Sequence, residues 1–270
     1  MSNAMRATLK RWVERAGLLG VAFRVHEYLK AREARRRHPA AFRGLAADGL
    51  PMPPAGHLVL VGGETNAEAF LQGGAHTAQT IRSVLAAHGA DIGQFRAILD
   101  FGCGCGRVMR HWQSLPGRVE LHGTDYNAAL IEWSRKNLPF GRFHINSLAP
   151  PLSHADGSFD LVYAFSVFTH LTAALQVAWI AELTRVLAPG GYLFITVHGE
   201  SFRNQLSVDE ARQFDAGDLV VRHAGMAGSN LCAAFHPLPY LRRMAGELEV
   251  IDHRPALLGQ DVVLLRKRAA

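Results

Sequence analysis

The most regular hydrophobic pattern of the chain lies between residues 95 and 198, where short apolar runs alternate with longer segments of helical periodicity. The apolar runs predict strands near residues 96–101, 119–124, 142–146, 159–164 and 191–198. Between them, apolar residues at every third or fourth position predict helices near residues 105–114, 127–138 and 172–187, the last two with Asn127 and Thr172 as N-caps. Because strand and helix alternate, we expect right-handed crossovers and a parallel sheet, hence an α/β fold.

The segment before this core predicts two further helices. Thr65–Glu68 has the form of a capping box, in which an acid three positions after a hydroxyl residue helps to open a helix. Gly73–Gly74 is expected to break that helix, and the apolar spacing from His76 to His88 predicts a second one that leads into the first strand.

After the core the rhythm changes. Pro237–Ala245 predicts a helix, and Leu248–Ile251 and Asp261–Leu265 predict two strands. Residues 200–234 show no clean period. Since irregular insertions often carry binding residues, we expect this segment to cover a substrate site.

The beginning of the chain differs from the rest in charge. Residues 6–37 hold ten Lys or Arg against three Glu, a net +7 in a chain whose formal total is +6, so the remainder is close to neutral. Apolar residues recur at helical spacing within this segment, namely Leu9, Trp12, Val13, Ala16 and Leu19. We predict a basic amphipathic helix, or a pair of helices, that docks on its own domain or on a second copy. An anionic membrane surface is a weaker alternative, and a nucleic-acid arm is weaker still.

We therefore divide the chain in two. Residues 1–56 are interpreted as the basic helical extension with a proline-marked linker (Pro51, Pro53, Pro54), and residues 57–270 as one domain. Met1–Ala4 has the form of an expression scar.

Composition narrows the class of protein. No apolar run approaches the ~20 residues of a membrane span, and no secretory signal is evident. Three cysteines are too few for a disulfide framework, and the Cys103-x-Cys105 pair lacks a second pair of ligands, so we predict a cytoplasmic protein without a metal site.

The chemistry of the chain is concentrated after its first predicted strand. Ile98–Phe101 runs into three alternating glycines, Gly102, Gly104 and Gly106, and the next predicted strand ends in Asp125. Alternating glycines allow a tight turn and the close approach of a ligand, and a carboxylate at Asp125 can accept hydrogen bonds from both hydroxyls of a ribose. A nucleoside-bearing cofactor across the ends of two neighbouring strands is therefore expected. The G-x-G-x-G spacing and Asp100 in front of it disfavour a pyrophosphate and favour a ligand with an ammonium and a sulfonium.

Two further segments extend this observation. The run D-F-G-C-G-C-G-R with Asp125, the segment Asp156–Ala164 and the turn Arg185–Leu193 resemble the motifs of the class I S-adenosylmethionine-dependent methyltransferases over roughly residues 95–197. The resemblance implies S-adenosylmethionine as cofactor. It also implies a Rossmann-like, mostly parallel sheet of seven strands in the order 3-2-1-4-5-7-6, flanked by helices, with an antiparallel hairpin at its edge and an extra N-terminal helical segment.

The resemblance also assigns cofactor-binding residues: Asp100, Gly102, Cys103, Gly104, Gly106, Asp125, Tyr126, Asn146, Ser147, Phe165 and Ser166. Asp100 would face the amino group, directly or through water, while Asp125 would hold the ribose and Tyr126 would pack on the adenine. The amide oxygen of Asn146 can accept a hydrogen bond from the adenine amino group, in place of the acid that the family often has there. Ordinary core packing is an alternative for Tyr126 and Phe165.

The acceptor side carries weaker signals. His170, where many family members also have a histidine, would act as the base or orient the substrate, although it can equally cap the next helix. His198, His236 and Gln260 are weaker candidates for substrate contacts. Ala164–Val167 replaces the Pro-Pro motif of amino-methylating enzymes that act on nucleic-acid bases, and there is no Pro-Cys dipeptide. We therefore expect in-line methyl transfer to a small-molecule or saccharide-like acceptor and no nucleic-acid partner.

Two other functions remain open at this stage. One is a cofactor-binding module without catalysis that acts as an interaction partner through its basic helix. The other is an NAD-dependent oxidoreductase, which the glycine spacing disfavours.

Overall fold

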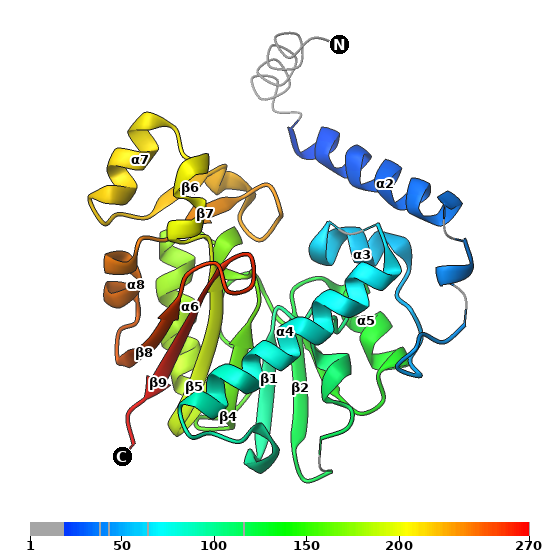
Figure 1. Cartoon of the computed structure of the whole chain (residues 1–270), viewed down its shortest axis with the longest axis horizontal. Helices are drawn as coiled ribbons and strands as arrows, with labels where there is room; N and C mark the ends of the chain where they lie inside the picture. Colours follow the sequence, from blue (N-terminus) through cyan, green and yellow to red (C-terminus); the bar gives the residue numbers. More distant parts are fainter. Residues whose placement is uncertain (1–18, 38, 43, 64, 116, 270) are drawn as a thin grey trace.

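The computed structural model describes residues 19–37, 39–42, 44–63, 65–115 and 117–269, and its centre is a seven-stranded sheet (Figure 1). The strand order is β3-β2-β1-β4-β5-β9-β8. Strands β1 to β5 are parallel to one another, while β9 is antiparallel to both β5 and β8. The strands are β1 (Ala97–Phe101), β2 (Glu120–Asp125), β3 (Arg142–Ile145), β4 (Phe159–Ala164), β5 (Leu187–Val197), β8 (Leu248–Arg254) and β9 (Asp261–Lys267). The predicted Rossmann-like order and the antiparallel edge are confirmed.

The pleat of the strands divides the core into two layers. Leu99 and Val162 pack with α6 (Ala173–Val186) and α8 (Leu238–Met244) on one face. Ile98 and Leu161, their neighbours in sequence, face the other layer, which contains α4 (Ala67–Ala87) and part of α5 (Ala128–Asn137). Since both faces are covered, the central strands are continuous runs of buried residues, as parallel sheets require.

The helix predicted to end at Gly73–Gly74 does not break there, which corrects the sequence prediction. Helix α4 continues through both glycines to Ala87, and its N-cap is Asn66, whose side chain accepts from the amide of Glu68 at 2.9 Å, rather than Thr65. A Cβ at position 74 would lie less than 3.0 Å from the carbonyl oxygen of Arg107. These glycines therefore allow the helix to approach the segment after β1.

A second correction concerns residues 105–114, for which the sequence predicts a helix. The structure has turns there and a short 3-10 helix, η3 (Met109–Trp112). Gly106 has a φ of 72°, which no right-handed helix contains. The fully buried Arg110 in η3 is ion-paired with Asp48, which fixes this segment against the loop that contains Asp48.

Two segments lie at the end of the sheet where the parallel strands terminate, at the top of Figure 1. One is α2 (Leu19–Arg37), followed by η1 (Pro39–Phe42) and α3 (Ala55–Gly62). The other is the irregular insertion, which holds η5 (Glu200–Gln205), α7 (Val208–Asp215), η6 (Ala224–Met226) and a small antiparallel pair, β6 (Val220–Arg222) and β7 (Ala233–Phe235).

Helix α2 is held by small residues. Ala31 and Ala34 are buried against Ala55 and Val59 of α3. The apolar stripe from Leu9 to Ala16 lies outside the described residues, as does the side chain of Leu19. Among the described helices, none is both long and apolar enough to cross a lipid bilayer.

Candidate functional site

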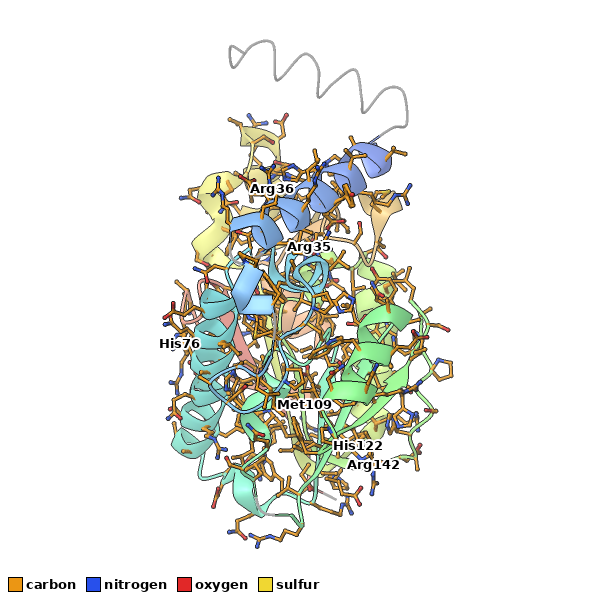
Figure 2. The ribbon with its side chains drawn as sticks, turned by 90° about the vertical axis from the view of Figure 1, so that its right-hand side faces the viewer. Arg35, Arg36, His76, Met109, His122 and Arg142 are labelled. Carbon is orange, nitrogen blue, oxygen red and sulfur yellow. The ribbon has the colours of Figure 1, made fainter. Side chains whose placement is uncertain are left out.

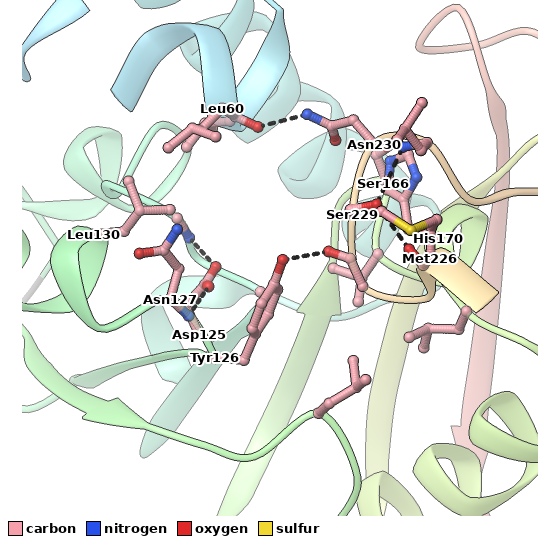
Figure 3. Close-up of a pocket in the computed structure, with 18 of the residues that line it drawn as sticks. Leu60, Asp125, Tyr126, Asn127, Leu130, Ser166, His170, Met226, Ser229 and Asn230 are labelled. Atoms are coloured by element: carbon pink, nitrogen blue, oxygen red, sulfur yellow. Dashed lines mark hydrogen bonds between the residues drawn. The ribbon is translucent and has the colours of Figure 1, made fainter. Parts of the chain in front are cut away.

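A cavity of about 290 Å³ lies where β1, β2 and β4 end (Figure 3). We call its strand-end side the floor, formed mainly by Phe101, Gly102, Gly104, residues 125–127, 146–148 and 165–167, His170 and Leu171. The opposite side, the roof, consists of residues of α2 (Gly20, Phe23, Arg24 and Glu27) and residues 226–231. Nine residues predicted from sequence line the cavity: Gly102, Gly104, Asp125, Tyr126, Asn146, Ser147, Phe165, Ser166 and His170.

The glycine loop has the geometry that only glycine accommodates. Gly102, Gly104 and Gly106 have φ values of 75°, 55° and 72°. A Cβ on Gly104 would lie 2.6 Å from the side chain of Val61, and one on Gly102 would lie less than 3.0 Å from that of Val167. Gly106 packs instead against Leu138 and does not line the cavity. Its role is therefore to turn the backbone.

Asp125 is held in place by two backbone amides. Gly104 donates to Oδ2 at 2.9 Å and Asn127 donates to Oδ1 at 2.8 Å. Burial raises the pKa of this carboxyl, and the amides of Asn127 and Gly104 oppose that effect. A carboxyl oxygen has more than one lone pair, so Asp125 keeps acceptor capacity toward the cavity.

Asp100 lies beneath the glycine loop and does not line the cavity. It is 4% exposed, and the hydroxyl of Tyr163 donates to it while Trp112 Nε1 donates to Tyr163 at 3.1 Å. Burial raises the pKa of Asp100 to about 8; the Tyr163 hydrogen bond opposes this and the charge of Asp125 adds to it. Any contact of Asp100 with a ligand's amino group therefore runs through water or through a movement of the loop.

The cysteines of the loop are packing residues in this geometry. Cys103 and Cys105 are buried free thiols, and neither lines the cavity. Burial raises the pKa of Cys105 to about 12 and that of Cys103 well above its ordinary value, so both stay protonated near neutral pH.

Tyr126 and Asn146 form one end of the cavity. The Tyr126 hydroxyl donates to the carbonyl of Gly228 at 2.5 Å and so joins the floor to the roof (Figure 3). Asn146 donates its amide N–H to the carbonyl of Ser147 at 2.7 Å. Its Oδ1 is buried and has no hydrogen-bond partner within the described part of the chain. An acceptor oriented in this way suits a ligand that brings an N–H donor.

Ser166 and Phe165 follow β4 at the other end. Ser166 has a positive φ of 59°, an uncommon conformation for a residue with a side chain. Its amide donates to Thr196 Oγ1 at 2.8 Å, and Gln260 donates to its hydroxyl at 2.8 Å. Gln260 therefore does not reach the cavity, and it supports Ser166 from behind.

His170 reaches the cavity in a defined tautomer. Its Nδ1 lies 2.7 Å from the carbonyl of Cys232, and since a carbonyl only accepts, Nδ1 carries the proton. In the neutral ring, Nε2 then has a free lone pair. Burial lowers the pKa of His170, so the ring is neutral at pH 7 and is able to take up a proton.

The structure does not bring His198 and His236 to the cavity. The backbone amide of His236 donates to the carbonyl of His198 at 2.7 Å, and the ring of His198 stacks on Phe202. Burial lowers the pKa of His198 to about 4 and that of His236 to about 3, so both rings are neutral. Their surroundings are those of packed residues of the insertion.

The roof was not predicted from the sequence at the level of residues. Asn230 donates to the carbonyl of Leu60 at 3.0 Å and is hydrogen-bonded to Glu27, so it connects α3, α2 and the insertion. The pKa of Glu27 is raised, chiefly by burial. The irregular pattern of residues 200–234 indicated a cover over the site, but nothing in the sequence placed α2 there.

Comparisons with known proteins agree with this geometry. Residues 98–191 match the model of a methyltransferase domain family. Probable tRNA methyltransferase 9B of Mus musculus is 29% identical over 136 residues, which cover 46% of this chain and 25% of that protein. Malonyl-[acyl-carrier protein] O-methyltransferase of Legionella pneumophila is 32% identical over 106 residues, covering 38% of this chain and 37% of that protein. The matches thus span well under half of the length of these curated relatives.

Solved structures share the fold. An S-adenosylmethionine-dependent methyltransferase from Mesorhizobium loti aligns with a TM-score of 0.53 at 14% identity, over 68% of this chain and 96% of that one. The 1,6-didemethyltoxoflavin-N1-methyltransferase of Burkholderia thailandensis, solved with S-adenosylhomocysteine, aligns with a TM-score of 0.50 at 18% identity, over 71% of this chain and 78% of that one.

Proposed function

We propose that this chain uses S-adenosylmethionine to methylate a small-molecule acceptor in the cavity between floor and roof. Residues 98–191 match the model of a methyltransferase domain, and the sheet has the Rossmann-like order of the class I enzymes. The observation that supports this most is the convergence of Asp125, Asn146 and the glycine loop on one cavity with His170.

The floor fits the cofactor. Asp125 is proposed to accept from the ribose hydroxyls, and the unpartnered Oδ1 of Asn146 to accept from the adenine amino group. Tyr126 would pack on the adenine, and Ser147 would line the same end. Gly102 and Gly104 leave room for the methionyl part beside Phe165 and Ser166, with Asp100 as a water-mediated partner of the amino group. When bound, the cofactor supplies a methyl group on a positively charged sulfur.

The roles of the protein's own groups are alignment and proton transfer. The roof closes the cavity over the acceptor, which limits water and orients the nucleophilic atom. Where that atom is a hydroxyl, phenol or ammonium, its proton must leave, and His170 Nε2 is proposed to accept it. Protonation there is compatible with the site because Nδ1–H already donates to Cys232.

The acceptor class is inferred from the composition of the cavity and from the room that the cofactor leaves. The cavity of about 290 Å³ must hold the cofactor as well as the acceptor, so a bulky acceptor does not fit. Arg24 and Glu27 offer polar contacts from the roof, and the aromatic rings of Phe23 and Trp179 also line the cavity. This mixture suits a compact acceptor of mixed polarity, such as a saccharide-like or heterocyclic metabolite.

Calorimetry and a turnover panel test the proposal. S-adenosylhomocysteine should bind the purified chain with one site, and NAD should not. With labelled S-adenosylmethionine, we expect transfer to members of a hydroxylated and amine metabolite panel and none to tRNA. Robust labelling of tRNA would overturn the small-molecule acceptor, and binding without turnover on either panel would favour a non-catalytic module. Absence of heat with S-adenosylhomocysteine would overturn the function as a whole.

A further inference from the structure

Three imidazoles that the proposed function does not use converge outside the cavity. His122 lies in β2, His144 in β3 and His154 in the loop 146–158 that joins β3 to β4. One ring nitrogen from each lies within 4.8 Å of the other two. His122 is 9% exposed, and His144 and His154 are half-buried, so the cluster is sheltered from bulk water without being sealed from it.

The sheet itself makes two of the rings neighbours. Thr124 pairs with His144 and His122 pairs with Arg142. His144 therefore lies two positions further along the paired strands than His122, and both side chains are on the same face of the sheet. Their rings stack with centroids 6.4 Å apart and planes 14° apart. The ring of His154 meets both almost at right angles, each at 5.4 Å. In Figure 2, His122 lies close to Arg142 near the lower end of the sheet.

The hydrogen bonding of these rings is incomplete. Nδ1 of His122 and both nitrogens of His154 are buried and have no hydrogen-bond partner among the described residues. Buried polar atoms without partners are costly, so they call for a ligand. Nε2 of His122 lies 3.3 Å from a carboxylate oxygen of Glu120. This contact places the ring proton on Nε2 and leaves Nδ1 as the electron-pair donor, the arrangement that supports histidines bound to metals.

The loop that carries His154 is held independently. Arg185 donates to the carbonyl of His154 at 2.9 Å, and Glu182 accepts from the amide of Leu152 at 2.6 Å. Arg185 and Glu182 are themselves ion-paired. The backbone on both sides of His154 is therefore fixed to α6 before any ligand arrives.

We propose that His122, His144 and His154 bind one divalent transition-metal ion, best matched by Zn²⁺, which fastens the loop 146–158 to the β2–β3 edge of the sheet. Three neutral nitrogen ligands and one open position for water suit zinc, whose tetrahedral sites use imidazole at about 2.0–2.1 Å. Such bond lengths place ligand nitrogens about 3.3 Å apart, so a modest rotation of the rings completes the site.

The charges around the three histidines are compatible with the binding of a metal cation. Arg142 and Arg185 are the nearby cations, and each is ion-paired, Arg142 with Glu120 and Arg185 with Glu182. Neither guanidinium is therefore an uncompensated positive charge beside the proposed ligands.

The site would be structural. His122 precedes Asp125 by three residues and His144 precedes Asn146 by two, but none of the three histidines lines the cavity, so the metal would lie beside the floor and not in it. The loop that it would fasten begins with Asn146, Ser147 and Leu148, which line the cavity. Metal binding should therefore stabilise one wall of the cavity without taking part in the chemistry.

The proposal is tested by titrating the full chain, first treated with a chelator, with Zn²⁺ at pH 7.5, with competition against a colorimetric zinc indicator. One equivalent should bind, and His154→Ala should weaken binding at least a hundredfold. Co²⁺ should give a visible absorption spectrum typical of a four- or five-coordinate site, lost in the same variant. His76→Ala, on the exposed side of α4, is the matched control and should bind as the unaltered chain does.

Circular dichroism shows whether each variant is folded, and His144→Gln replaces His154→Ala should the latter fail to fold. Hydrogen exchange of residues 146–158 should slow when Zn²⁺ is bound to the unaltered chain. The proposal is overturned by failure of the unaltered chain to bind an equivalent, or by unchanged affinity in a folded His154→Ala or His144→Gln variant. Binding of S-adenosylhomocysteine is measured separately, so the fate of the metal site does not decide that of the cavity.

Discussion

The floor and the roof of the cavity are built in different ways. On the floor, Asp125 is fixed by two backbone amides, and Ser166 by Thr196 and Gln260. The roof depends on a few contacts between distant segments, such as Asn230 with Leu60 and Tyr126 with Gly228. A rigidly held floor suits the proposed cofactor, whereas a roof with fewer connections can adapt to the acceptor. Specificity should therefore reside mainly in the roof.

His170 tests the comparison most strongly because it belongs to the floor but serves the acceptor. His170→Gln should lower kcat by about 10²–10⁴-fold, as expected for loss of a positioned base, with little change in the affinity for S-adenosylhomocysteine. In the unaltered chain burial lowers the pKa of His170, so the ring stays neutral to a lower pH than an ordinary histidine does. Activity should persist as the pH is lowered and fall only when the pH passes through that lowered pKa. The variant should lack this acid limb, and an unchanged pH–rate profile would contradict the role.

Asp125 tests the floor alone. Asp125→Ala should weaken S-adenosylhomocysteine binding about tenfold to a hundredfold, on the order of 1–3 kcal/mol, through loss of charge-assisted hydrogen bonds. Asp156→Asn serves as the control, because this carboxylate is exposed and does not line the cavity. Calorimetry measures the affinity of each variant for S-adenosylhomocysteine. An affinity of Asp125→Ala equal to that of the unaltered chain would show that Asp125 does not bind the ribose.

Substitutions in the glycine loop test whether the floor can accommodate an added side chain. In Gly89→Ala the only cost is backbone strain from the positive φ, because no atom lies within 4 Å of the added Cβ. This variant should lower the free energy of unfolding by about 1–2 kcal/mol. Gly102→Ala combines the same strain with overlap of Val167, which should cost about 1–3 kcal/mol more. Urea unfolding measures the free energy of unfolding of both variants. Equal losses in the two would show that the glycine loop shifts to accommodate the added methyl group, contrary to our inference.

The smallest effects are expected in the roof. Asn230→Ala removes the hydrogen bonds to Leu60 and Glu27, and it should raise the KM for the acceptor by about fivefold, which corresponds to about 1 kcal/mol. The affinity for S-adenosylhomocysteine should stay within a factor of two or so of the unaltered value, since the floor is intact. A change of equal size in the KM for the acceptor and in the affinity for S-adenosylhomocysteine would show that the roof does not act on the acceptor alone.

The same distinction explains what could be predicted from the sequence. The floor could be predicted because its signals are local: Asp125 ends an apolar strand, and Gly102 and Gly104 follow another. The strand order was implied by the resemblance to a family, which itself rests on local motifs in sequence, and the structure confirmed it.

What could not be predicted depends on contacts between distant residues. Phe23 and Glu27 reach the cavity only because Ala31 and Ala34 pack on α3. The alternation of β2 and β3 brings His122 beside His144, but His154 joins them through a loop whose course depends on Arg185. Periodicity describes one element at a time, and these sites lie between elements.

The passage of α4 through Gly73–Gly74 reverses a familiar rule of protein engineering. Replacing a mid-helix glycine by alanine ordinarily stabilises a helix by about 0.5–1 kcal/mol, which makes it a standard choice in consensus thermostabilisation. At position 74 the added methyl group would overlap the backbone of Arg107, which a flexible side chain cannot relieve. A saturation library scored for folded protein should find Gly74 invariant, and automated stabilisation schemes based on helix propensity should fail there first.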